Sequence, residues 1–71
     1  MFNFDMKTTQ NFACFIDEAS GISVFVDSFD NQEFEVRLGD VLASKVIGKF
    51  IAADDRDLNN SLTKLVEGKL H

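Results

Sequence analysis

Four carboxylates in the middle of the sequence form the first group that could bind a ligand. They are Asp27, Asp30, Glu33 and Glu35, and carboxylate oxygens are the ligands that Ca²⁺ prefers. An EF-hand loop needs alternating acids, a central glycine and a terminal glutamate, and this segment lacks that order. We therefore interpret it as a solvated acidic hairpin and expect no bound metal.

The residues that could catalyse a reaction are isolated in the sequence. Cys14 is the only cysteine, so it cannot form an internal disulfide, and the only histidine, His71, is the last residue. No Ser–His–Asp or Cys–His arrangement can be assembled from these residues. The four glycines are too far apart for a phosphate-binding loop. We expect a non-enzymatic protein without cofactors, in which Cys14 is a buried, inert thiol.

Charge is unevenly distributed along the 71 residues. The net charge is −5, but residues 1–35 hold seven acids and one base, a net of −6, and residues 36–71 have a net of +1. Seven of the eight phenylalanines lie in the acidic half. An acidic chain is not attracted to nucleic acid or to anionic lipid, so we expect neither as a direct partner.

The length and the apolar pattern of the sequence bear on the number of domains and on the cellular compartment. No apolar run approaches the roughly 20 residues of a membrane-spanning helix. The N-terminus lacks the basic region and apolar core of a secretory signal. We expect one small domain over residues 1–71 in the cytoplasm.

Three segments of the first half have the composition of strands. Residues 12–17, 22–27 and 33–38 are rich in aromatic and β-branched side chains, and the last two alternate between apolar and polar positions. This pattern predicts strands that are buried on one face.

Two other patterns near the N-terminus leave alternatives open. Residues 9–19 also fit a helix, because several of their apolar side chains recur at helical spacing. Phe2, Phe4 and Met6 alternate, which fits either a short edge strand or a frayed terminus.

Two short connections set the predicted register of the strands. We interpret residues 18–21 as a three-residue turn with Gly21 in a bulge, which places Ile16 opposite Val24 and directs Phe12, Cys14 and Ile16 inward. Residues 30–32 form the second loop, with Asn31 at positive φ.

The second half has helical periodicity. Asp40 is the predicted N-cap of a helix through Ala53, because the apolar residues between them fall on one side of a helical wheel. A second helix follows, capped by Asp55 or Asp57 and ending near Gly68. Its apolar stripe is Leu58, Leu62, Leu65, Val66 and Leu70. Capping accounts for the aspartates at 54, 55 and 57 more simply than a second acidic site.

These elements predict an α+β domain. An antiparallel three-stranded meander, with a possible extra N-terminal edge strand, is followed by two amphipathic helices, the first packed on one sheet face. The expected inner face is Phe12, Cys14, Ile16, Ile22, Val24, Val26, Phe34, Val36 and Leu38.

The opposite face of the sheet is the candidate binding surface, because an exposed apolar patch usually marks a contact site. In the predicted register Phe15 lies opposite Phe25, and Phe25 lies opposite Arg37. The full candidate set is Phe15, Phe25, Asp17, Asp27, Glu33, Glu35 and Arg37. Two simpler interpretations are that Arg37 stacks on Phe25 only to stabilise the sheet, or that another segment covers this face.

The functional hypothesis is a small acidic protein-binding module, an adaptor or an inhibitor, that also forms a homodimer through this face or a sheet edge. One alternative is a nucleic-acid mimic that inhibits a DNA- or RNA-handling protein, as small proteins of phages and other mobile elements can. Another is a structural homo-oligomer with no further partner.

Overall fold

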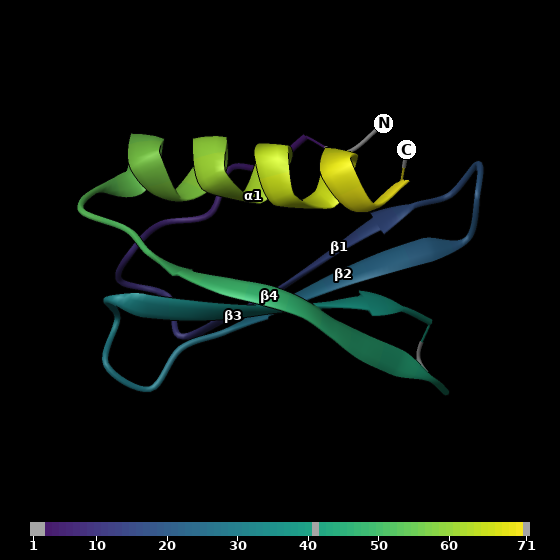
Figure 1. Ribbon diagram of the computed structural model, residues 1–71, viewed down its shortest axis with the longest axis horizontal. Coiled ribbons are helices and arrows are strands. Elements are labelled where there is room, and N and C mark those ends of the chain that lie inside the picture. The colour runs from purple at the N-terminus through teal and green to yellow at the C-terminus, as the bar shows by residue number, and fades with distance from the viewer. Residues whose placement is uncertain (1–2, 41, 71) are drawn as a thin grey trace.

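Four antiparallel strands form a twisted sheet, and one helix lies across it (Figure 1). This computed structural model describes residues 3–40 and 42–70, the last of them without its side chain. The strands follow one another across the sheet in chain order. They are β1 (Phe12–Asp17), β2 (Ile22–Asp27), β3 (Glu33–Gly39) and β4 (Ser44–Ile51), followed by α1 (Asp55–Leu70).

The predicted α+β class and the first three strands are confirmed. β1 and β2 have the predicted bounds, and β3 is one residue longer than expected. The helical alternative for residues 9–19 is wrong, because most of that segment is β1 and its turn. Residues 3–11 contain no strand, so an edge strand through Phe4 and Met6 is wrong too. Phe2 and His71 lie outside the described residues.

The first hairpin differs from the prediction by one residue. Asp17 pairs with Ile22, so four residues connect β1 and β2, and the Gly21 amide donates to the Asp17 carbonyl at 2.8 Å. Gly21 has the expected positive φ, at 74°. Because side chains alternate along a strand, one extra loop residue exchanges the two faces of β1. The predicted inner position of Phe12, Cys14 and Ile16 is therefore wrong.

The second hairpin has the predicted register. Val26 pairs with Val36, and Phe25 pairs with Arg37. Asn31 has a φ of 59°, as the loop chemistry indicated.

The predicted helix from Asp40 to Ala53 is wrong, because this segment turns and returns as β4. Asp40 does accept hydrogen bonds from the amides of Leu42 and Ala43, at 2.9 and 2.8 Å, as a cap would. However, the Asp40 amide also donates to the Ala43 carbonyl at 3.0 Å, which closes a hairpin instead of starting a helix. This turn leaves no room for a side chain at position 39, because a Cβ on Gly39 would lie only 2.7 Å from the Ser44 Cα.

A β-bulge in β4 explains why its sequence resembles a helix. Val36 pairs with Gly48 and Arg37 pairs with Val46, so Ile47 has no residue opposite it on β3. Ile47 contacts the core while Val46 is 51% exposed. A bulge of this kind breaks the period-two alternation that identifies strands in a sequence.

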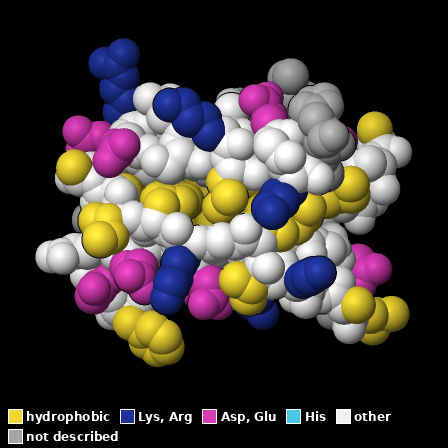
Figure 2. All heavy atoms as spheres, viewed as in Figure 1, with side chains coloured by type: hydrophobic (Ala, Val, Ile, Leu, Met, Phe, Trp, Pro, Cys, Tyr) yellow, Lys and Arg dark blue, Asp and Glu magenta, His cyan; other side chains and the backbone are white. Residues whose placement is uncertain are grey.

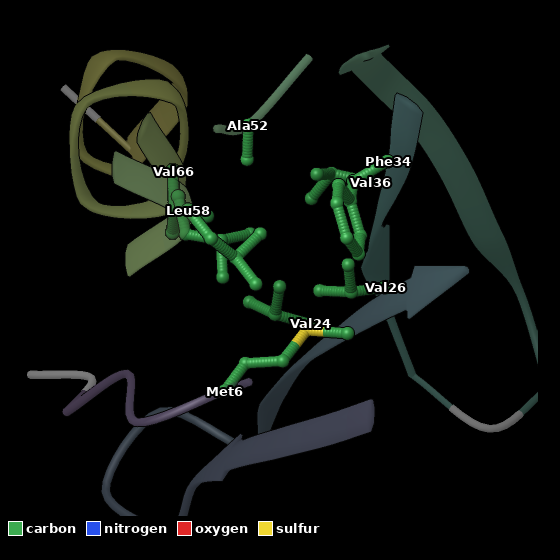
Figure 3. Packing of buried hydrophobic residues seen from close by; sticks show 9 residues of the cluster. Met6, Val24, Val26, Phe34, Val36, Ala52, Leu58 and Val66 are labelled. Atoms are coloured by element: carbon green, nitrogen blue, oxygen red, sulfur yellow. The ribbon is translucent and has the colours of Figure 1, made fainter. Parts of the chain in front are cut away.

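The hydrophobic core lies between α1 and one face of the sheet (Figure 3). Figure 3 shows side chains from β2 and β3 pointing toward side chains from α1, with Met6 entering from the N-terminal segment. The buried set is Met6, Val24, Val26, Phe34, Val36, Ala52, Leu58, Leu62 and Val66.

The helix cap is neither of the two predicted residues, since it lies one residue before Asp55 and three before Asp57. Asp54 is the cap, since its carboxylate accepts from the Asp57 amide at 2.8 Å and its carbonyl accepts from the Leu58 amide at 2.9 Å. Asp57 in turn accepts from the Ala53 amide at 3.0 Å. Gly68 lies inside α1. Within the described residues, no helix has both the length and the apolar character needed to cross a membrane.

The N-terminal segment runs beside α1 and is fixed to it by Asn59 (Figure 1). The Asn59 side chain accepts from the Met6 amide at 2.8 Å and donates to the Met6 carbonyl at 2.9 Å. Asp55 accepts from the Thr8 amide at 2.7 Å. These bonds place the buried Met6 side chain in the core.

Replacing Gly39 by alanine tests the turn before β4. We expect Gly39→Ala to lower the free energy of unfolding by more than about 1 kcal/mol, because the new methyl group would overlap the Ala43 backbone. The matched control, Gly68→Ala, has no atom within 4 Å of the added Cβ and should raise stability by about 0.5 kcal/mol. Urea unfolding measures both. A neutral Gly39→Ala would contradict the hairpin.

Replacing Asn59 by alanine tests the attachment of the N-terminal segment. We expect Asn59→Ala to cost about 1–3 kcal/mol, because the buried segment at Met6 loses both hydrogen bonds. Asn60 is exposed on the same helix, and Asn60→Ala should change stability by no more than about 0.5 kcal/mol. Amide exchange should show faster exchange at Met6 in Asn59→Ala alone. Equal effects of the two substitutions would contradict this role.

Candidate functional site

The face of the sheet that points away from α1 has no described element over it (Figure 1). Every strand contributes side chains to this surface, which we call the open face. Its residues are Phe12, Cys14 and Ile16 of β1, Phe25 and Asp27 of β2, Glu33, Glu35 and Arg37 of β3, and Val46, Lys49 and Ile51 of β4.

The structure brings five of the seven predicted site residues together on the open face. They are Phe25, Asp27, Glu33, Glu35 and Arg37.

Two predicted site residues lie elsewhere. Phe15 points toward the core, where its ring makes an edge contact with Phe4 at a centroid distance of 5.0 Å. Its predicted position opposite Phe25 is wrong, since Cys14 occupies that place. Asp17 is the last residue of β1 and lies outside the open face, and its carboxylate accepts from the Ser20 hydroxyl of the first turn at 3.0 Å.

An arginine, an aromatic ring and a carboxylate form the centre of the open face. The Arg37 guanidinium carbon lies 5.5 Å from the centroid of Phe25, and its Nη2 atom donates to Asp27 Oδ2 at 2.9 Å. The contact over the ring contributes about 0.5–1 kcal/mol at an exposed site. The half-exposed ion pair adds at most about 1 kcal/mol. Together they hold the guanidinium in one position, and Arg37 offsets the repulsion between Asp27 and the facing Glu35.

The other carboxylates of the open face also lie beside a cation. Lys49 Nζ is 3.7 Å from Glu33 Oε1, and Lys49 faces Glu35 in the strand register. Figure 2 shows acidic and basic side chains next to each other along the lower edge of the molecule. The open face is therefore mixed in charge, and most of the net charge of −5 lies elsewhere.

Four large apolar side chains of the open face were missed by the sequence analysis. Phe12 is 51% exposed, Ile16 62%, Val46 51% and Ile51 71%. The predicted register places Phe12 and Ile16 in the core, and the predicted helix from Asp40 to Ala53 contains Val46 and Ile51, so both predictions are wrong at these positions. Cys14 is exposed beside them, so the prediction of a buried thiol is wrong.

Two hollows, both open to solvent, are lined in part by the Arg37 side chain. One has a volume of about 530 Å³ and includes the fully exposed ring of Phe29 at its margin. It is lined by Asn11, Asp27, Ser28, Phe29, Glu35 and Arg37. The other has a volume of about 240 Å³ and is lined by Phe12, Phe25, Arg37, Asp40 and Ser44.

Hydrogen bonds in the turns lower the pKa of two carboxyl groups, those of Asp30 and Asp17. The amides of Glu33 and Gln32 donate to Asp30 at 2.9 and 3.0 Å, and these bonds lower the pKa of its carboxyl group. The Ser20 hydroxyl lowers the pKa of Asp17 in the same way. Among the described residues, no three histidine, cysteine, aspartate or glutamate side chains gather where they could hold a metal ion.

No family model matches this chain, and no curated protein or solved structure is significantly similar to it.

The lowered pKa of Asp30 predicts an acid-sensitive turn. Its folded pKa lies below the ordinary value of 3.8, so the ionised carboxylate stabilises the fold fully above that value. The contribution is lost as pH falls through the folded pKa. The free energy of unfolding of Asp30→Ala should therefore differ most from that of the natural sequence near neutral pH, and the difference should shrink as the pH falls below 3.8. Urea unfolding at several pH values measures it, and a difference independent of pH would contradict the assignment.

Proposed function

We propose that the protein is a small protein-binding module, an adaptor or an inhibitor without catalytic activity, and that its open face contacts the partner. The observation that carries this proposal is the exposure of Phe12, Ile16, Val46 and Ile51 on one sheet face, each by half or more. Large apolar side chains exposed on an uncovered surface, here at both edges of the open face, are typical of contact sites. Each 100 Å² of apolar surface that a partner removes from water contributes about 2.5 kcal/mol.

The centre of the open face has the composition of a binding hot spot. Arginine and aromatic side chains are enriched among the residues that dominate binding energy. Here Arg37 is held over Phe25 by its bond to Asp27, so little conformational freedom would be lost when a partner packs against it. The two hollows beside Arg37 offer places for projecting side chains of that partner.

The charge distribution supports protein binding over nucleic-acid mimicry. A mimic needs a dense, unpaired array of negative charge to compete for a basic groove. The carboxylates of the open face instead lie beside Arg37 and Lys49. Apolar contacts should therefore contribute more to binding than charge does.

Substitutions in β4 test the proposal, with the immobilised chain used to capture its partner from a lysate of the source cells. The double variant Val46→Thr/Ile51→Thr keeps β-branched side chains and removes apolar surface. It should weaken binding of the captured protein at least about tenfold, measured by titration. The matched control, Leu42→Thr, changes a side chain that is 93% exposed in the turn before β4. Equal affinities of the double variant and the control would exclude the open face.

A salt titration separates this function from mimicry. Between about 50 and 500 mM salt, apolar binding should change little, whereas binding of a polyanion mimic should fall steeply. A partner that is released by salt and displaced by heparin would contradict the proposal.

A further inference from the structure

We propose that β1 pairs with β1 of a second copy of the chain in antiparallel orientation. A two-fold axis at Cys14 would then join two four-stranded sheets into one continuous sheet. This inference concerns the edge of the sheet and does not depend on the proposed function, whose test uses β4 at the opposite edge.

The two edge strands of the sheet, β1 and β4, differ in how well they are protected against pairing with another chain. Proteins protect exposed edge strands against pairing with lysines, bulges or prolines. β4 has a bulge at Ile47 and two exposed lysines, Lys45 and Lys49. β1 has no bulge in its pairing with β2 and no lysine, and within the described residues it pairs with β2 alone. The unprotected edge is the one suited to intermolecular pairing.

The charge pattern favours the same edge. A chain with a net charge of −5 repels a second copy over most of its surface. Residues 8–16 form the longest stretch of the sequence without a charged side chain, and β1 occupies most of it. Two copies that meet along this stretch bring no like charges directly opposite each other between Phe12 and Ile16.

The sequence of β1 is complementary to itself. With the axis at Cys14, Phe12 lies opposite Ile16 of the second copy, and Ala13 lies opposite Phe15 of the second copy. The first pair joins an aromatic and a β-branched side chain on the open face, a favourable combination across strands. The second joins a small and a large side chain on the core face. Every pair keeps its face, as a continuous sheet requires.

This symmetry favours a second copy over an unrelated extended peptide as the occupant of the edge. Phe12 and Ile16 are half or more exposed in the single chain, and pairing places each of them beside an apolar side chain of the second copy while the open face stays accessible. An isologous contact of this kind closes as a dimer and leaves the edges at β4 unpaired. It also places the two open faces next to each other on one side of the assembly.

Light scattering after gel filtration tests the dimer, with a lysine at the axis as the variant. The natural chain should have about twice the 8.0 kDa mass of one copy. Cys14→Lys places two like charges opposite each other at an exposed position, and should raise the dissociation constant at least about tenfold. Leu42→Lys adds the same charge in an exposed turn and should remain dimeric. Circular dichroism checks that each variant is folded, and Ile16→Thr provides a milder second variant that should also weaken the dimer.

Disulfide formation tests the register. Residues directly opposite in antiparallel strands have Cα atoms about 4.5–5.5 Å apart, which is within disulfide range. A mild added oxidant should therefore link Cys14 to Cys14 of the second copy rapidly. The double variant Cys14→Ser/Ser20→Cys carries its thiol in the exposed first turn and should link far more slowly.

Several results would overturn the proposal. They are a monomer at all concentrations, a dimer unaffected by Cys14→Lys, and equal cross-linking of the two thiols. Protection of β1 amides from exchange only when a different protein is bound would show that the edge accepts a foreign strand instead. None of these results bears on the Val46→Thr/Ile51→Thr test of the proposed function.

Discussion

The length of the connection between β1 and β2 determines which side chains enter the core and which remain exposed. The Gly21 amide bonds to the Asp17 carbonyl, and the Asp17 carboxylate bonds to Ser20, so the turn closes over four residues. Because the side-chain period of a strand is two, this count places Phe15 in the core and Phe12 on the open face. The composition of the open face and the pattern of the β1 edge both depend on that single turn.

A second constraint is the number of elements that can cover the sheet. The segment after Asp40 pairs with β3 as β4, which leaves α1 as the only described helix. That helix and the N-terminal segment, joined through Asn59 and Met6, cover the inner face. No described element remains for the other face. A sheet with one face covered and one face open is a stable arrangement for antiparallel strands, and here the open face retains large apolar side chains.

The fold class and three strands could be predicted from the sequence, because all three segments are rich in aromatic and β-branched residues and two of them alternate cleanly. The structure of the segment after Asp40 could not be predicted in this way. An aspartate that accepts amide hydrogen bonds two and three residues ahead has the same sequence signature at a helix cap and in a hairpin turn. The bulge at Ile47 then gave two adjacent apolar residues, as a helix would. Only the pairing of β3 with a neighbour distinguishes these structures.

The candidate site could be predicted only in part, because the position of each residue depends on the register that the neighbouring turn sets. Phe25, Arg37 and Asp27 lie in a hairpin whose loop chemistry fixed the register, so their positions followed from alternation. The position of Phe15 depended on a turn in which three and four residues are both compatible with Gly21, and alternation in β1 did not distinguish the two.

Several acidic residues of the chain serve its turns and the helix start, and this changes how the net charge of −5 relates to function. Asp30 and Asp40 each accept backbone amides in hairpin turns, and Asp54 caps α1. Aspartate suits these places because a short side chain with two oxygens reaches nearby amides, and because negative charge favours a helix N-terminus. Asp27 and Glu33 lie in ion pairs on the open face. Contacts in turns and at the helix cap therefore account for several of the twelve acidic residues, so the net charge of −5 does not by itself indicate a polyanionic binding surface. Turn chemistry leaves the exposed apolar surface of β1 and β4 unexplained, and the proposed contact with another protein rests on that surface and not on the charge.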